Sequence, residues 1–148
     1  MTNYDPHYVN TPAYFLLGVK VIVVNKSNQM LLLKRSDKVS SPHRWDFPGG
    51  GVDKGESPEA SAVRECLEEA GLAIENIRPL TTFWQQEGSD EVIIIGFSAT
   101  VAHDEITLSW EHEDYRWIAQ DSPVLAELPE MHVRIHEAYK KQLISNPR

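Results

Sequence analysis

The sequence predicts an α/β protein that forms one domain over residues 1–148. Three observations support this class: runs rich in Val, Ile and Leu that read as strands, a thirteen-residue segment with helical periodicity, and a second helical pattern near the C-terminal end. Strands that alternate with helices are typical of α/β folds. A chain of 148 residues is long enough to bury one core and too short for two comfortable ones.

The first half of the chain begins with two expected strands. Residues 15–24 and 30–34 are rich in β-branched and aliphatic side chains, and the turn-forming residues 25–28 separate them. A loop over residues 36–44 then leads to the stretch Trp-Asp-Phe-Pro at residues 45–48 and to three consecutive glycines. We expect this part of the chain to form two strands followed by a long loop.

The next expected element is a helix with clear start and stop signals. Ser57 is a good N-cap, Pro58 suits the first turn, and Gly71 is a natural end. Apolar residues recur at i, i+3, i+4 and i+7, namely at Val63, Cys66, Leu67 and Ala70. We expect this stripe to pack on the core, with the acidic residues of the helix on the side that faces away from it.

The remaining elements are three strands and a closing helix, expected at residues 77–85, 92–101, 115–118 and 129–145. The turn residues 87–90 join the first two of these strands. Met131, Ile135 and Tyr139 recur at roughly helical spacing in the last segment, which therefore reads as an amphipathic helix.

Three carboxylates on the first helix indicate a metal site. Glu65, Glu68 and Glu69 lie within about 100° of one another around the axis. Like charges at this spacing cost about 0.2–0.5 kcal/mol per pair, and anions in the second half of a helix cost about 0.3–1 kcal/mol each. A solvated acidic face does not explain these costs. Hard divalent cations prefer carboxylate oxygens, and the glycines at 49–51 allow close backbone approach, so we expect Mg²⁺ or Mn²⁺ beside a phosphate-bearing substrate.

Residues 50–72 read GGVDKGESPEASAVRECLEEAGL. The spacing is Gly50, five residues, Glu56, seven residues, Arg64-Glu65, two residues, Glu68-Glu69, one residue, then Gly71 and an apolar residue. This stretch resembles the complete signature box of the Nudix hydrolases, which split diphosphate linkages with a divalent metal. The resemblance implies an α/β/α sandwich around a mixed sheet, with the box as a loop-helix-loop that binds the metal.

The resemblance also implies roles for individual residues. Glu68 and Glu69 would be metal ligands, and Glu65 a ligand or the general base for water. Gly49, just before the box, would offer its backbone carbonyl to a metal. Glu56 and Arg64 would form a structural ion pair that anchors the loop to the helix.

Many members of this family draw a further acidic ligand or base from a later loop. The stretch WEHEDYRW at residues 110–117 resembles that region, with Glu111 as the first choice and Glu113 and Asp114 as alternatives. Arg35, at the end of the second expected strand, is either a contact to substrate phosphate or an exposed strand-end charge. Trp84 either stacks on a nucleobase or packs on the sheet. His132 and His136, four residues apart, are expected as surface or packing residues rather than as a metal pair.

The family resemblance predicts a substrate in which a nucleoside diphosphate is linked to another group. We expect a (deoxy)nucleoside triphosphate that gives nucleoside monophosphate and pyrophosphate. A nucleotide sugar or another such diphosphate is the alternative, and hydrolysis at an RNA 5′ end is a further one. A non-catalytic nucleotide-binding regulator is the remaining alternative, although an intact box favours catalysis. The sequence does not identify the base, the sugar, the leaving group or the number of metals.

Composition limits the partners of this chain. The net charge of −8 argues against nucleic-acid and membrane binding through surface electrostatics. The chain has one cysteine, so an intrachain disulfide is excluded. The apolar run over residues 13–24 is too short for a bilayer and Lys20 interrupts it, and no basic region of a signal peptide precedes it. We expect a cytoplasmic enzyme, and the sequence leaves its oligomeric state open, a homodimer included.

Overall fold

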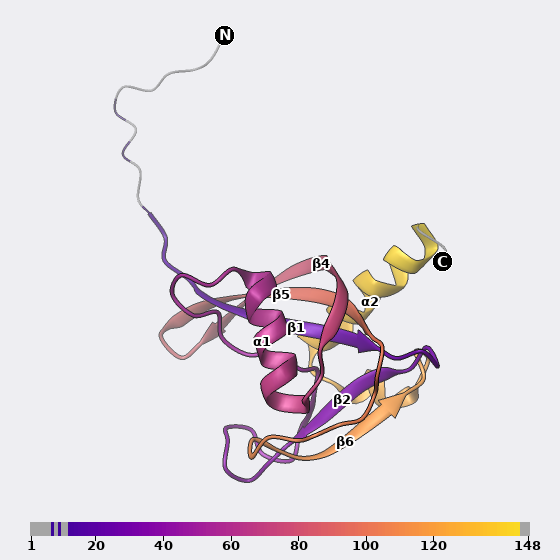
Figure 1. The fold of residues 1–148 in the computed structure, drawn as a ribbon. Helices are drawn as coiled ribbons and strands as arrows, with labels where there is room; N and C mark the ends of the chain where they lie inside the picture. The colour runs from indigo at the N-terminus through magenta and orange to yellow at the C-terminus, as the bar shows by residue number, and fades with distance from the viewer. Residues whose placement is uncertain (1–6, 8, 10–11, 146–148) are drawn as a thin grey trace.

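The structure is a computed structural model that describes residues 7, 9 and 12–145. Strands and helices alternate as predicted (Figure 1). In chain order the elements are β1 Leu16–Val24, β2 Met30–Arg35, β3 Trp45–Asp46, α1 Pro58–Ala70, β4 Ile74–Glu87, β5 Asp90–Val101, β6 His112–Ile118, the 3₁₀ helix η1 Pro123–Glu127 and α2 Glu130–Ser145. The sequence did not predict β3 or η1, and β4 and β6 are longer than expected.

A mixed sheet of six strands lies at the centre of the described residues. Its order is β3-β2-β1-β5-β4, and β6 pairs with β2. β1 runs parallel to β5, with Val19 opposite Ile95, and the other neighbouring strands are antiparallel. β1 is therefore the central strand, and residues on both of its faces are buried.

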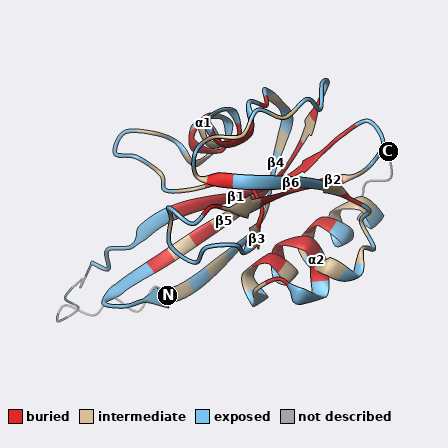
Figure 2. Cartoon of the chain, turned by 90° about the horizontal axis from the view of Figure 1, so that it is seen from below, coloured by how far each residue is buried: buried red, intermediate tan, exposed pale blue. Residues whose placement is uncertain are grey.

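The two helices cover opposite faces of this sheet (Figure 2), as the sandwich architecture requires. Side chains alternate along β1, because successive residues of a strand point to opposite faces. Val19, Val21 and Val23 pack with α1, whereas Ile22 and Val24 belong to the cluster under α2. The predicted α/β/α arrangement is confirmed. In the part of the chain that the structure describes, no helix combines the length and apolar character needed to cross a bilayer.

The ends of α1 follow the predicted signals. The Ser57 hydroxyl accepts a hydrogen bond from the Ala60 N–H at 3.1 Å. Gly71 takes the left-handed conformation, with a φ of 71°, and its N–H bonds to the Leu67 carbonyl. Local capping chemistry therefore sets the bounds of this helix.

The buried face of α1 differs from the prediction. The small residues Ala62, Cys66 and Ala70 are fully buried, whereas Val63 and Leu67 are 39% and 56% exposed. These small residues lie one helical turn apart and allow α1 to pack closely on β1. The helix is rotated so that its acidic flank, rather than Val63 and Leu67, turns toward the sheet. The expectation that all three acids face away from the core is therefore wrong for one of them, as shown below.

Candidate active site at the acidic flank of α1

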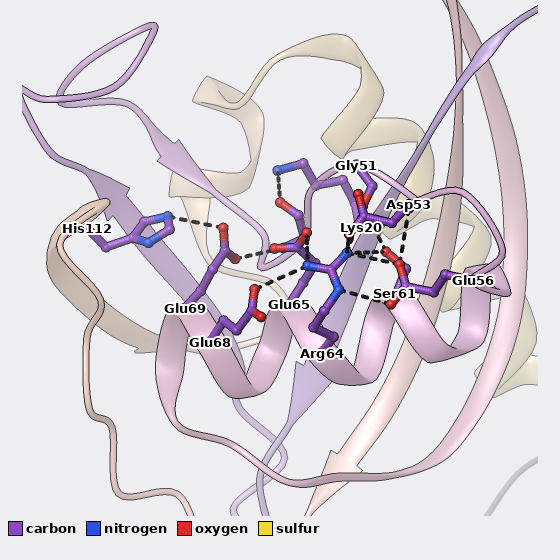
Figure 3. Close-up of polar contacts among 11 residues, drawn as sticks. Lys20, Gly51, Asp53, Glu56, Ser61, Arg64, Glu65, Glu68, Glu69 and His112 are labelled. Atoms are coloured by element: carbon purple, nitrogen blue, oxygen red, sulfur yellow. Dashed lines mark hydrogen bonds and ion pairs between the residues drawn. The ribbon is translucent and has the colours of Figure 1, made fainter.

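The acidic flank of α1 is organised around one arginine (Figure 3). Arg64 Nη1 donates to Glu65 Oε1 at 2.8 Å and to Glu68 Oε2 at 3.1 Å. Its Nε donates to Glu56 Oε1 at 2.9 Å, and its Nη2 donates to the Gly51 carbonyl at the same distance. The three glutamates raise the pKa of Arg64, with the Glu56 hydrogen bond as the largest cause, and burial opposes this shift. Arg64 therefore contacts Glu56 as the family resemblance implied, and it also holds two of the expected metal ligands.

Glu69 is the acid that the sequence misplaced. It is only 5% exposed, and its Oε2 accepts a 2.8 Å hydrogen bond from the Gly49 N–H. Burial raises the pKa of Glu69 to about 8, although the nearby positive charge of Lys20 and the Gly49 hydrogen bond oppose this shift. His112 Nε2 lies 3.8 Å from the other oxygen of the same carboxylate. A buried carboxyl with a strongly raised pKa is typical of a functional site.

The glycine loop passes so close to β1 and α1 that a side chain is sterically excluded at Gly49, and at Gly50 it would displace the carboxylate of Glu65. A Cβ on Gly49 would lie 2.1 Å from the Val19 carbonyl oxygen, and the φ of Gly49 is +140°. A Cβ on Gly50 would lie 2.6 Å from the carboxylate of Glu65. No atom lies within 4 Å of a Cβ built on Gly51, so the expected need for close approach is not seen there. The loop backbone thus lies directly against two of the acids of α1.

Of the three later acids, Glu111 is the one whose charge reaches the site. Burial is the main cause that raises the pKa of Glu65, the charges of Glu68 and Glu111 add to it, and Arg64 opposes it. Glu113 instead pairs with Lys34, with 2.8 Å between Oε1 and Nζ. The contacts of the protein therefore favour Glu111 over Glu113 as the additional acid.

The third candidate, Asp114, is exposed and accepts a hydrogen bond from the N–H of Tyr115. It lies opposite Lys34 in the pairing of β2 with β6. This local contact gives Asp114 no link to the acids of α1.

A cavity of about 500 Å³ opens on the α2 side of the sheet, between β1, β3, β4 and the start of α2. We call it the α2-side pocket. Its wall combines basic, acidic, aromatic and apolar residues, including Lys20, Arg35, Arg44, Asp46, Glu87, Glu130, Trp45, Phe83 and Met131. A wall with both cations and aromatic rings suits a nucleotide, whose phosphates are anionic and whose base is flat.

The two predicted substrate contacts lie differently with respect to the α2-side pocket. Arg35 lines it, and its Nε donates to the Ser40 carbonyl at 2.7 Å. Trp84 does not line it, because successive strand residues point to opposite faces and its neighbours Phe83 and Gln85 do. Trp84 is 54% exposed on the other face, so neither stacking in this pocket nor full packing describes it.

Sequence reasoning missed a buried charge network at the floor of this pocket. Lys20 Nζ donates to Asp46 Oδ2 at 2.6 Å, and His132 Nε2 lies 2.5 Å from Asp46 Oδ1. Burial raises the pKa of Asp46, but Lys20 and His132 together hold it below its usual range. A lone lysine inside the apolar run of β1 was the available signal, because a buried ammonium requires an acidic partner.

The two histidines of α2 have separate surroundings. Both His132 and His136 are buried, at 3% and 6% exposure, so of the two expected kinds of position, surface or packing, they take the packing one. His132 Nε2 is taken by Asp46. Burial lowers the pKa of His136. The helix therefore uses these histidines singly, as the sequence reasoning preferred.

The acids of this site have the oxygen donors that a hard divalent cation prefers, but contacts within the protein occupy these carboxylates. Within the described residues, no three Asp, Glu, His or Cys side chains converge as a metal cage. The contacts explain why, since Arg64 holds Glu65 and Glu68 while Glu69 is bound to the Gly49 N–H. The donor set consists of carboxylate and carbonyl oxygens, which Mg²⁺ and Mn²⁺ prefer. To bind a metal, Glu65 and Glu68 would therefore have to give up their hydrogen bonds to Arg64.

Comparison with known proteins gives matches over most of the chain. The family model described as NUDIX domain matches residues 15–141. The bis(5′-nucleosyl)-tetraphosphatase (asymmetrical) of Rattus norvegicus is 32% identical over 125 residues, which are 80% of this chain and 83% of that protein.

Two further matches differ in coverage. A putative 8-oxo-dGTP diphosphatase of Bacillus subtilis is 57% identical over 54 residues, and this match spans only 36% of this chain and 34% of that protein. Among solved structures, the MutT protein of Methanosarcina mazei superposes with a TM-score of 0.71 at 26% identity, over 94% of this chain and 100% of that one.

Proposed function

Since this chain belongs to the Nudix family, whose matched relatives are hydrolases of phosphorus anhydrides, we propose that it hydrolyses a nucleoside diphosphate linked to another group. The proposed substrate is a (deoxy)nucleoside triphosphate, and the products are a nucleoside monophosphate and pyrophosphate. The observation that carries the proposal is the cluster of Glu65, Glu68 and buried Glu69 against a glycine loop that Gly49 and Gly50 bring into contact with it.

The proposed ligands of the divalent metal are Glu68 and Glu69, with Glu65 as a third ligand or as the general base, and with the Gly49 carbonyl and Glu111 as additional oxygen donors. Glu65, Glu68 and Glu69 carry three formal negative charges, and among the cations of residues 12–145 only Arg64 donates hydrogen bonds to two of them. A divalent ion would offset the remaining charge. Glu56 would keep Arg64 attached to the loop while Glu65 and Glu68 turn to the metal, because Glu56 bonds to different nitrogens of the guanidinium.

A bound Mg²⁺ or Mn²⁺ ion would offset the negative charge of the phosphate oxygens and lower the pKa of a water. The protein supplies the proton acceptor, and Glu65 is the proposed base. Its pKa is raised, mainly by burial, so this carboxylate is a better acceptor than an exposed one. Glu111, whose charge acts on Glu65, is the alternative base. Arg35 in the α2-side pocket would bind a substrate phosphate.

One further substrate class has specific support. The rat relative, of which 83% is covered by the match to this chain, is named as a bis(5′-nucleosyl)-tetraphosphatase. A dinucleoside polyphosphate is therefore the second candidate substrate. The putative 8-oxo-dGTP diphosphatase matches over about a third of either chain. Because its name specifies a nucleoside triphosphate, this class of substrate also belongs in the test. Nucleotide sugars share the same nucleoside diphosphate element and belong in the same comparison.

The test is a panel of nucleoside triphosphates, dinucleoside polyphosphates and nucleotide sugars with Mg²⁺, with each product identified by mass. Release of pyrophosphate and nucleoside monophosphate supports the triphosphate proposal. Two nucleotide products from a dinucleoside polyphosphate, at a higher kcat/KM, would replace it with the second candidate. Tight nucleotide binding without any turnover in Mg²⁺ or Mn²⁺ would favour a regulator and contradict both.

A further inference from the structure

We propose that Lys20 is a positioning residue for the metal-binding loop, and that through Asp46 it joins this loop to the wall of the α2-side pocket. The inference rests on the proposed function, in which the Gly49 carbonyl is a metal ligand. Lys20 Nζ donates to Asp46 Oδ2 at 2.6 Å and to the backbone carbonyls of Phe47 and Gly49, each at 3.2 Å. Three acceptors around one ammonium use all three of its donors.

The position of Lys20 makes this arrangement specific. Lys20 is 9% exposed in the middle of β1, between the fully buried Val19 and Val21. A charged group in such a place is costly unless it is paired and fully hydrogen-bonded. An apolar residue would extend the core without that cost, so the contacts to Asp46 and to the loop are the feature that needs an explanation.

Both polar backbone groups of Gly49, its N–H and its carbonyl, make hydrogen bonds to buried side chains. Its N–H donates to Glu69 Oε2 at 2.8 Å, and its carbonyl accepts from Lys20 at 3.2 Å. Steric contact with the Val19 carbonyl excludes a side chain at this position. A carbonyl has two lone pairs, so the Lys20 hydrogen bond leaves one for a metal while it fixes the direction of the oxygen.

The ammonium group of Lys20 also lies at the α2-side pocket, where the nucleotide is proposed to bind. Lys20 and Asp46 both line the α2-side pocket. The carboxylate of Asp46 is fixed from other directions by His132 at 2.5 Å and by Arg35 Nη1 at 3.7 Å. His132 belongs to α2, so one carboxylate links this helix, the pocket wall and Lys20. A nucleotide in the pocket would therefore contact the pair that holds the loop.

Positioning and simple electrostatics predict opposite effects for Lys20→Met. Removal of a positive charge close to a cation site would tighten divalent metal binding on Coulomb's law alone, since Asp46 would keep only His132 and Arg35 as partners. Loss of the group that fixes the Gly49 carbonyl would weaken it. Groups that orient metal ligands typically contribute about 10–100-fold in affinity, so we expect Mn²⁺ binding about tenfold weaker or more.

The experiment measures Mn²⁺ binding without substrate, from the electron paramagnetic resonance signal of free Mn²⁺, in wild type and Lys20→Met. The pH is kept above the pKa of about 8 of Glu69, so that this ligand is ionised. Lys34→Met is the matched control, because Lys34 on neighbouring β2 pairs with Glu113 outside the site. The control should bind Mn²⁺ as wild type does.

A second variant separates stability from positioning. Lys20→Met with Asp46→Asn removes both charges of this pair, keeps a polar side chain beside His132 and Arg35, and should bind Mn²⁺ as weakly as the single variant. Wild-type or tighter affinity in either variant would overturn the proposal, as would failure of both to fold. Absence of Mn²⁺ binding and of hydrolysis in the wild type would instead refute the proposed function itself.

Discussion

Glu69 and Gly49 are joined by a 2.8 Å hydrogen bond from the backbone N–H of the glycine to the buried carboxylate, twenty residues further along the chain. This contact connects the loop to α1 inside the protein, at a carboxyl whose pKa burial raises to about 8. It therefore places a titratable group at the junction of the two parts of the signature box. Four predictions concern this junction and the helix beside it.

The metal-free protein should lose stability as pH rises from about 4.5 to about 8. The pKa of Glu69 is raised from its ordinary value of 4.5 to about 8, so in this range the folded state binds more protons than the unfolded state. Unfolding free energy then falls with increasing pH and levels off above the folded pKa. Urea unfolding at several pH values tests this, and Glu69→Gln should remove most of the slope. An equal slope in that variant would assign the effect to other groups.

Glu68→Gln should abolish turnover without unfolding the protein. The side chain of Glu68 is exposed and its hydrogen bond to Arg64 is a surface contact, so little stability is at stake. As a proposed metal ligand, it should lower kcat by about 100-fold or more, since even groups that only support a ligand contribute about 10–100-fold. Steady-state kinetics in Mg²⁺ provides the measurement, and full activity would refute the assignment.

Gly49→Ala should destabilise the protein, and Gly51→Ala should not. At Gly49 the φ of +140° and the 2.1 Å approach to the Val19 carbonyl both oppose a side chain. The backbone conformation alone should cost roughly 1–3 kcal/mol. Gly51, two residues on, has open space at the same position. Thermal or urea unfolding of the two variants checks this, and equal stabilities would show that the loop can move away from β1.

Leu67→Ala should change the unfolding free energy by less than about 0.5 kcal/mol, as is usual for exposed positions. Leu67 is 56% exposed although it belongs to the apolar stripe of α1. Ile135→Ala, at a fully buried position of α2, should cost about 2–5 kcal/mol. Urea unfolding distinguishes the two, and a large loss at Leu67 would indicate an interface that covers it.

Local signals predicted the elements of this fold well, because capping and periodicity act over a few residues. Ser57 and Gly71 mark the ends of α1 where the sequence placed them. The orientation of α1 could not be predicted in the same way. Two aliphatic side chains indicated one buried face, but small residues allow closer packing on β1, and the helix buries Glu69 instead.

Tertiary contacts account for what the sequence analysis missed at the site. Lys20 and Asp46 lie 26 residues apart, and they meet because the segment that follows β3 bonds to β1, where the Val21 N–H donates to the Pro48 carbonyl. His132 reaches the same carboxylate from 86 residues away. At the α2-side pocket, the aromatic side chain is that of Phe83 rather than Trp84, and an alternation of apolar and polar residues along β4 would have indicated which of the two faces the pocket. Both positions are aromatic, so the pattern gave no sign of it.

Arg64 gives the protein a resident counter-ion whose charge does not vary with pH. Its pKa lies above its ordinary value, so it stays protonated wherever the protein is folded. Under the proposed function, a divalent ion would compete with Arg64 for Glu65 and Glu68, and its binding should be insensitive to the protonation of the arginine. Acid sensitivity of metal loading would arise elsewhere, at the interior carboxyl of Glu69. α1 thus combines a permanent positive charge, which is hydrogen-bonded to Glu65 and Glu68, with a titratable carboxyl at Glu69 whose ionisation should set the pH dependence of metal binding.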